Sequence, residues 1–399
     1  MDNLTHGLAG AALAEAVLRF GPGPLRARTP EALTERRGLY LLTSVVANNA
    51  PDLDLVLSPL LPAPLGYLMH HRGHTHTLGF LPLQLVVVLG LVALWPSLRR
   101  RLRDDPGARW GALLLAGLGL GVHLGLDALN SYGVHPFWPF HGRWSYGDLV
   151  FIVEPVLWAA FGAPVAALAR GRIGRGSLLA LMVGVPVAAG AFGLVFPVAA
   201  VAVLGLVGGL FAVTRRVGAG AGLAAGLASA LAFLAIQAQG QAGAATAARA
   251  AASAPGVEVD LVLSPLPSNP LCWSWIRVTA EAAANQWHLE RGVVSANAEW
   301  VPTAECPQGL GATRLEAARE QGDLRALASR AREDCHLDTW LRFARAPSVN
   351  VRRATDWRFI AQGEQNFSTL ALDGATVRDC PGPIPGWARP RQDLLDLAR

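Results

Sequence analysis

The sequence predicts a mainly α-helical, polytopic membrane bundle of about eight helices, followed by a small C-terminal α+β domain outside the membrane. The first observation behind this is composition: of 399 residues, 52% are hydrophobic and 16% charged, and the mean hydropathy is positive. Soluble domains carry about 25% charged residues. The second is that apolar stretches near the ~20 residues needed to cross a bilayer recur up to about residue 240 and then stop.

The apolar stretches differ in character along the chain. The first carries His6 and Glu15 and lacks the basic start and cleavage site of a signal peptide, so we expect a retained, partly polar helix. The last has Gly218, Gly222 and Gly226 at a spacing that lets helices pack closely in lipid. The expected helices cover residues 3–20, 39–60, 77–97, 110–130, 150–169, 177–194, 197–213 and 218–238.

Arginine clusters predict the orientation of these helices. All 34 basic residues are arginine, and their clusters occupy every second connection. Short loops rich in arginine stay on the cytoplasmic side, which places the N-terminus, the 60–76 and 131–149 loops and the chain after about residue 240 outside a bacterial-type inner (cell) membrane. The clusters are Arg26, Arg28, Arg36 and Arg37; Arg99, Arg100, Arg101 and Arg103; Arg170, Arg172 and Arg175; Arg215 and Arg216.

The pattern of polarity divides the chain into four parts. Most histidines lie in the first, further membrane helices form the second, and an Ala-rich linker leads to a soluble outer domain. Basic residues flank apolar runs rather than alternating with aromatics on one face, so we expect no nucleic-acid partner. The four parts are residues 1–170, 171–240, 241–254 and 255–399.

The last part has the signals of a small α+β domain. Strand-like runs cover residues 257–263, 273–278 and 287–294, and a helix is expected to open on the capping box Thr313-x-x-Glu316 and to continue past residue 330. All cysteines lie here, and thiols outside the cytosol oxidise. We expect two disulfides, with the pairing open, among Cys272, Cys306, Cys335 and Cys380.

Ionisable side chains cluster in the first part of the chain. Eight of the ten histidines precede residue 142, and ionisable groups at membrane depth are costly unless they have a function and partners. Asp52 and Asp54 follow an apolar stretch and can face one cation, and His123 and Asp127 share a helix face at i, i+4 spacing. Further groups that we expect to contribute are His6, His71, Arg72, His76 and Glu154.

The predicted orientation brings these groups to one side of the membrane. His6, Asp52, Asp54, His71, His76, Asp127 and Glu154 all lie towards the outer ends of their segments, and His123 lies about one turn deeper. Imidazole and carboxylate ligands together favour zinc, with manganese as an alternative. The sequence therefore predicts a divalent-metal site whose ligands are His6, Asp52, Asp54, His71, His76, His123 and Asp127.

Several short motifs in residues 1–160 carry a family resemblance. They are Leu4-Thr5-His6, Pro51-Asp52-Leu53-Asp54, His71-Arg72-Gly73-x-Thr75-His76, His123-x3-Asp127 with Tyr132-Gly133, and Phe151-Ile152, after which relatives have Asp-Pro and this chain Glu154-Pro155. Together they resemble the YdjM-like family of membrane-bound metal-dependent hydrolases. That family is distantly similar to zinc-dependent phospholipases C and single-strand nucleases. The resemblance implies hydrolysis that depends on one or more metal ions.

The expected function is metal-activated hydrolysis of a phosphodiester or phospholipid-like substrate at the membrane. Asp54 or Glu154 would accept the proton from water, and Arg72 would bind the substrate anion. Two alternatives remain open at this point. One is a transporter of metal ions or protons, and the other is a membrane scaffold whose outer domain binds a partner. The sequence does not define the oligomeric state.

Overall fold

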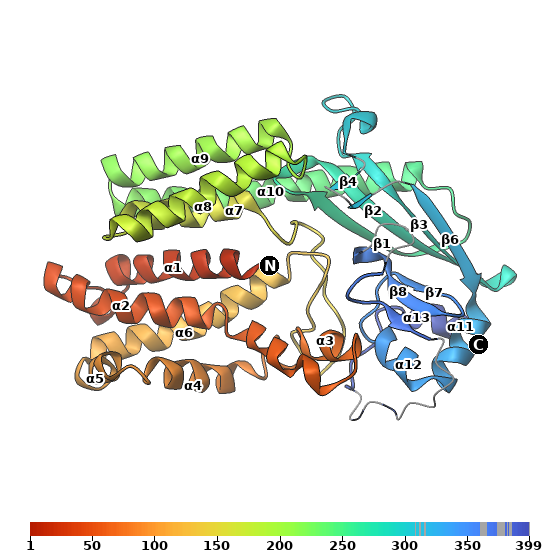
Figure 1. Cartoon of the computed structure of the whole chain (residues 1–399), viewed down its shortest axis with the longest axis horizontal. Helices are drawn as coiled ribbons and strands as arrows, with labels where there is room; N and C mark the ends of the chain where they lie inside the picture. The colour runs from red at the N-terminus through yellow and green to blue at the C-terminus, as the bar shows by residue number, and fades with distance from the viewer. Residues whose placement is uncertain are drawn as a thin grey trace.

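The computed structural model of the chain describes residues 1–307, 309–310, 313–314, 317–359, 365–372, 380, 382 and 385–398. The helices lie side by side as an elongated bundle, and the C-terminal domain sits at one end of it (Figure 1). The N-terminus lies at the junction of the two parts. The main helices are α1 (Asn3–Phe20), α2 (Pro30–Ala47), α4 (Leu81–Val92), α6 (Pro106–Asp127), α7 (Pro155–Leu168), α8 (Arg172–Ala191), α9 (Pro197–Arg216) and α10 (Ala219–Ala251).

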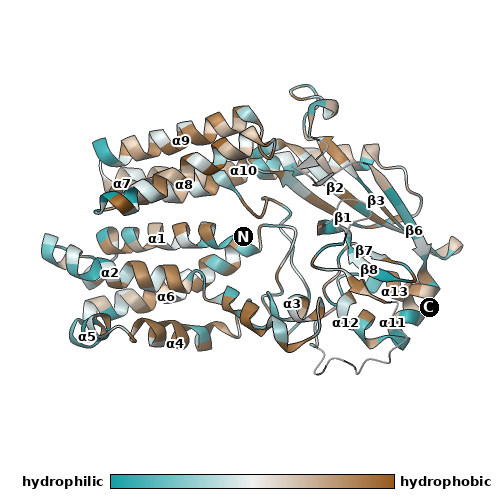
Figure 2. Cartoon of the chain, in the orientation of Figure 1, coloured by the Kyte–Doolittle hydropathy of each residue, from teal (hydrophilic) through white to brown (hydrophobic). Residues whose placement is uncertain are grey.

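Each of the eight predicted helices overlaps one of these, but fewer qualify as membrane spans. Among the described residues, four helices are long and apolar enough to cross a bilayer, namely α6, α8, α9 and α10. A fifth span is counted if α4 and the following α5 (Pro96–Asp104), which are bent by 116°, act together. The apolar helix α7 is shorter. Helices α8 to α10 expose many apolar side chains, and Figure 2 colours much of their length as hydrophobic.

Local signals explain where the helices begin. The Asp2 carboxylate accepts a hydrogen bond from Thr5 N at the start of α1, and Asp105 does the same for Ala108 N at the start of α6. Proline occupies the first helical position of α2, α6 and α7, where no backbone N–H is needed. These caps define the residues at which the helices begin, including α1 and α6, which carry site residues.

The arginine-rich connections meet at the end of the bundle far from the C-terminal domain (Figure 1). Arg36 pairs with Asp105 across two connections at 2.8 Å. The fully buried Glu15 of α1 is neutralised by Arg19 at 3.0 Å and by Arg37 at 2.5 Å. The arginine clusters of every second connection thus lie together at one end of the molecule.

Between α2 and α4 the chain does not form a long helix. A 3-10 stretch, η2 (Pro51–Leu60), replaces the second half of the span expected at 39–60, and a short helix, α3 (Leu65–His70), follows it. Pro51, Pro59 and Pro62 interrupt regular helix there, because proline removes a backbone donor and clashes with the preceding turn. This irregular segment carries Asp52 and Asp54.

The C-terminal domain is built around an antiparallel four-stranded sheet of order β1-β2-β3-β6. A smaller sheet, β7-β8-β9, and helices α11 (Leu324–Glu333) and α12 (Cys335–Leu341) pack beside it. The strands are β1 (Val257–Leu266), β2 (Asn269–Glu281), β3 (Gln286–Ser295), β6 (Ala318–Asp323), β7 (Pro347–Val349), β8 (Arg353–Asp356) and β9 (Leu370–Ala371); β4 (Gly309–Leu310) pairs with β5 (Thr313–Arg314).

Two local expectations for this region need correction. The helix predicted to start at the capping box begins instead at Leu324, where Asp323 caps it by accepting from Ala326 N; Thr313 lies in β5, and Glu316 lies outside the described residues. The Ala-rich segment 241–254, expected as a linker, largely continues α10 to Ala251, since alanine has the highest helix propensity. The two expected disulfides are present, as Cys272–Cys306 and Cys335–Cys380.

A buried arginine joins the C-terminal domain to the bundle. The Arg345 guanidinium donates to both oxygens of Asp148, in the loop after α6, at 2.7 and 2.8 Å. It also donates to Asp260 of β1 at 2.8 Å and stacks 4.0 Å from the Tyr146 ring. We call Arg345, Asp148 and Asp260 the Arg345 clamp. It fixes the loop that follows the site helix α6.

Candidate metal centre

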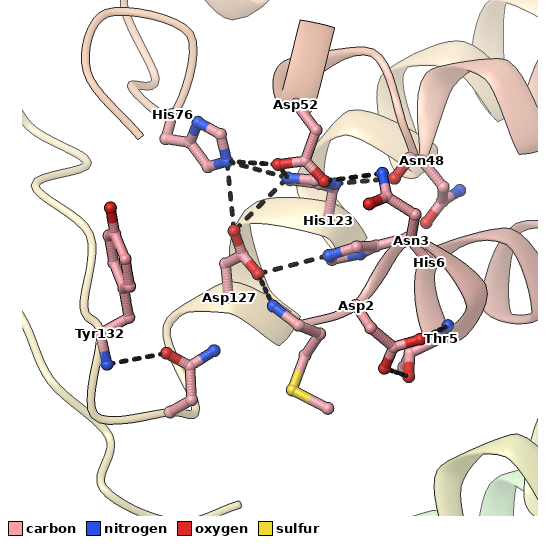
Figure 3. A network of polar contacts seen from close by, with 12 residues as sticks. Asp2, Asn3, Thr5, His6, Asn48, Asp52, His76, His123, Asp127 and Tyr132 are labelled. Atoms are coloured by element: carbon pink, nitrogen blue, oxygen red, sulfur yellow. Dashed lines mark hydrogen bonds and ion pairs between the residues drawn. The ribbon is translucent and has the colours of Figure 1, made fainter. Parts of the chain in front are cut away.

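Four ligand-type side chains converge at the end of the bundle next to the C-terminal domain (Figure 3). Asp52 comes from η2, His76 from the loop before α4, and His123 and Asp127 from the last turns of α6. All four are buried. We call Asp52, His76, His123 and Asp127 the tetrad.

The spacing of the tetrad matches a tetrahedral metal site. His76 Nε2 lies 3.0 Å from His123 Nε2, 3.1 Å from Asp127 Oδ2 and 3.5 Å from Asp52 Oδ1. His123 Nε2 lies 3.5 Å from Asp127 Oδ2 and 3.7 Å from Asp52 Oδ1. Ligands held about 2.0–2.1 Å from a central zinc ion in a tetrahedron would be roughly 3.3 Å apart. These five separations therefore suit one ion at their centre.

The two oxygens of Asp127 have different surroundings. Oδ1 contacts the Met1 nitrogen, accepts from Arg72 Nη2 at 2.8 Å, and lies 3.3 Å from His6 Nε2. Oδ2 is buried and accepts no hydrogen bond from the described residues, although it faces His76 and His123. Buried carboxylate oxygens are normally satisfied. An oxygen left open towards two imidazoles is what a cation ligand requires.

The backbone and neighbouring side chains orient the two imidazoles. His123 Nδ1 lies 2.7 Å from the Asn48 carbonyl oxygen, so Nδ1 carries the proton and Nε2 keeps its lone pair for the tetrad. His76 Nδ1 lies 3.4 Å from Asp54 Oδ2 and 3.0 Å from the Thr75 hydroxyl. Such outer contacts to the second ring nitrogen are typical of metal-binding histidines.

The electrostatics of the tetrad favour a positive charge. Burial by itself lowers the pKa of His76, but the carboxylates of Asp127, Asp52 and Asp54 beside its ring outweigh it and raise this pKa to about 10. Burial raises the pKa of Asp52, whereas the hydrogen bond with His76 and the charge of His123 bring it down to about 2. The carboxylates are thus ionised, and the site attracts a proton or a metal cation.

Three further residues predicted as ligands surround the tetrad instead of joining it. His6 stacks on His123 with ring centroids 3.8 Å apart. Asp54 accepts from the Arg72 backbone N–H at 2.9 Å and from the Thr75 hydroxyl at 2.5 Å. These bonds hold residues 71–76, which we call the histidine loop, against η2. His71 Nδ1 lies 3.2 Å from Asp54 Oδ1 and 4.0 Å from Asp52 Oδ1.

Arg72 is a structural neighbour of the tetrad. Its side chain is buried; besides Asp127 Oδ1 it donates to the Asp127 carbonyl at 3.3 Å, to Asn130 Oδ1 at 3.2 Å and to the Gly133 carbonyl at 3.2 Å. The Tyr132 ring lies 4.5 Å from its guanidinium carbon. These contacts make Arg72 a brace between Asp127 and the loop after α6, with a backbone φ of 59°.

Glu154 lies elsewhere. It caps α7 by accepting from Val156 N at 3.1 Å, and it accepts from the Ser268 hydroxyl at 2.9 Å and from Ser268 N at 3.1 Å. Burial raises its pKa to about 7, against the hydrogen bonds from Ser268 and Val156. No contact among the described residues joins Glu154 to the tetrad. Its observed role is to bind α7 to the turn between β1 and β2.

Two parts of the site were missed by sequence reasoning. One is the Asn48 carbonyl that orients His123, and backbone acceptors leave no residue-type signal. The other is the pairing of His71 with Asp54, which joins two separate motifs. The spacing of Pro51-Asp52-Leu53-Asp54 did point to paired carboxylates, but it could not tell which one enters the tetrad.

Comparison with known proteins agrees with the motifs that carry the site. The model of the YdjM inner membrane protein family matches residues 1–204, a range that contains the whole tetrad and ends before the C-terminal domain. Neither a curated protein nor a solved structure matches the chain significantly. The family match covers just over half of the sequence. The chain therefore belongs to the YdjM inner membrane protein family.

Proposed function

We propose that this membrane protein is a metal-dependent hydrolase that acts on a phosphodiester or phospholipid-like substrate. The observation that carries the proposal is the tetrad, with five ligand-atom separations of 3.0–3.7 Å and an open, buried Asp127 oxygen. Two imidazole nitrogens with two carboxylate oxygens suit zinc, with manganese as the alternative. The same orientation would put the site and the C-terminal domain on the outer side of the membrane.

A divalent metal held by the tetrad would supply Lewis acidity, which acidifies water and polarises a phosphoryl or acyl oxygen. The protein would position the other groups. Asp54 orients His71 through Nδ1 at 3.2 Å, which leaves Nε2 of His71 to accept a proton from water. Asp54, predicted to act as the base itself, would then act as a positioning residue.

The surroundings of His71 support this role. Its ring lies 5.0 Å from Tyr67 and 5.6 Å from Tyr132, and both tyrosines line a cavity between the bundle and the C-terminal domain. His71 keeps a small solvent-accessible fraction, 11% of its side chain, whereas His76 and His123 have none. Among these three imidazoles, His71 is therefore the one that we assign to accept a proton from water.

Hydrolysis by full-length protein in detergent tests the proposal. Zinc-loaded and manganese-loaded samples are given bis(4-nitrophenyl) phosphate and phosphatidylglycerol vesicles. We expect turnover that EDTA abolishes, and His71→Ala to lower kcat by about 10²–10⁴-fold while metal remains bound. His141→Ala, at an exposed histidine of the same outer region, is the matched control and should resemble wild type. Metal-loaded protein that cleaves neither substrate would refute the hydrolase.

A further inference from the structure

A cavity of about 400 Å³ lies where the two parts of the chain meet. The volume is within the range of small-molecule sites. The bundle contributes Tyr67 and the loop after α6, and the other wall comes from β1, β2, β3 and the segment after β8. The lining from the C-terminal domain includes Leu266, Trp275, Ile276, Trp357, Phe359 and Phe367.

One side of this cavity is connected to the metal centre through Asn130 and Arg72. Asn130, which lines the cavity, holds Arg72 at 3.2 Å, and Arg72 in turn holds Asp127. Asn130 is buried, and its Nδ2 donates no hydrogen bond to any described residue. An amide donor of this kind, next to Tyr132, offers a hydrogen bond to an anionic or ester oxygen.

The remaining lining is mostly hydrocarbon and aromatic. Trp275, Ile276 and Trp357 are buried. Arg291, which pairs with Ile276 across β2 and β3, adds a guanidinium to this wall, 5.3 Å from the Trp357 ring. The opening also has apolar residues, because Ile152 is 40% and Phe367 44% exposed. A polar region beside the metal centre followed by an apolar chamber suits an amphiphile rather than a free phosphate.

We propose that the C-terminal domain forms the acyl-chain chamber of the site, and that its occupant is a membrane phospholipid whose phosphodiester faces the tetrad. The inference rests on the proposed function for the chemistry at the head group. The chamber itself rests on separate residues, mostly beyond the family match at 1–204. The chain belongs to a membrane family, so its natural amphiphiles are bilayer lipids. Burial of the lipid's acyl chains against apolar surface then supplies binding energy remote from the reacting group.

Photo-crosslinking tests whether the chamber binds a lipid acyl chain, and it does not require turnover. Full-length zinc-loaded protein is reconstituted in phosphatidylglycerol vesicles that contain phosphatidylglycerol with a diazirine in one acyl chain, and labelled peptides are identified by mass spectrometry. We expect labels in residues 264–276, in residues 357–359 and at Phe367, besides those on the spanning helices. Labels confined to α8, α9 and α10 would overturn the chamber.

A cavity-filling variant and a matched control sharpen the result. Ser274 lines the chamber from β2, and Ser274→Trp should lower chamber labelling by about tenfold while leaving helix labelling unchanged. Ala298→Trp adds the same indole at an exposed position of the same domain and should label like wild type. Thermal unfolding verifies that both variants are folded, and unchanged chamber labelling in folded Ser274→Trp would also overturn the inference.

The two proposals fail in distinguishable ways. Chamber labelling without hydrolysis of any lipid would uphold acyl-chain binding in the chamber and reject the hydrolase. Hydrolysis with labels only on the helices would uphold the enzyme and reject the chamber. If both stand, Ser274→Trp should raise the KM for phosphatidylglycerol about tenfold and leave that for bis(4-nitrophenyl) phosphate unchanged, because only the lipid has chains to bury.

Discussion

Two buried clusters of charge in this protein differ in how their charges balance. In the Arg345 clamp, Asp148 and Asp260 face Arg345, and Arg391 adds a second cation 3.1 Å from Asp260. Around the tetrad, Asp127 pairs with the Arg72 guanidinium and with the Met1 nitrogen, whereas Asp52 and Asp54 face only histidines, which are neutral when they bind metal.

The difference separates a structural cluster from a functional one. Burial of a charge is costly unless it is paired. Together with Arg391, the clamp pairs two carboxylates with two guanidinium groups, so its charges balance. The tetrad has more acceptors than donors, and Asp127 Oδ2 accepts no hydrogen bond from the described residues. Buried acceptors at ligand spacing could therefore hold a cation, whereas burial of charge by itself gives no such indication.

Removal of a tetrad charge should have the largest effect. Asp127→Asn keeps the size of the side chain but places a neutral amide against two imidazoles, so we expect bound zinc to fall below detection in metal analysis of purified protein. Asp396→Asn, at an exposed aspartate near the C-terminus, is the control. Wild-type zinc content in Asp127→Asn would show that the tetrad does not hold the metal.

Loss of the clamp should cost stability and leave the tetrad's ligands intact. Arg345→Ala leaves Asp148 buried without its main partner, and we expect a loss of about 3–5 kcal/mol in the free energy of unfolding. Arg332→Ala, at an exposed arginine of the same domain, should change it by less than about 0.5 kcal/mol. Denaturant unfolding in detergent measures both. Equal stabilities would contradict the clamp's structural role.

A weaker effect is expected from the residue that orients His76 and the histidine loop. Asp54→Asn retains one acceptor but loses the charge that faces His71 and His76. Outer contacts of this kind usually contribute about 10–100-fold to metal affinity, so competition with a chelating dye should show a rise in Kd of that order. An effect as large as that of Asp127→Asn would mean that Asp54 is itself a ligand.

The smallest effect is expected at Glu154, and it should depend on pH. Burial raises its pKa to about 7, above the usual value near 4.3. The folded protein therefore binds the extra proton, and this contribution to stability is complete below about pH 4 and is lost as pH rises through 7. Relative to Glu154→Gln, wild-type thermal stability should decline over that window, by at most about 3 kcal/mol. Metal content should be equal in both proteins.

The sequence predicted the helical bundle, the disulfides and the residue types of the candidate site, because hydropathy, arginine position and residue identity are local signals. It predicted more spans than qualify by length and hydropathy in the described residues: α1 and α2 carry buried or exposed charges, and α7 is short. It could not separate Asp52 from Asp54, which depends on how η2 turns against the histidine loop. Nor could it find the Arg345 clamp, whose members are up to 197 residues apart.

The metal content of the full-length protein is the most direct test of the central claim. Protein stripped with EDTA, reloaded with zinc and passed through a desalting column should retain one zinc ion per tetrad. X-ray absorption should show only nitrogen and oxygen neighbours at about 2.0–2.2 Å. Protein that binds neither zinc nor manganese at micromolar concentration, while remaining folded, would contradict the account.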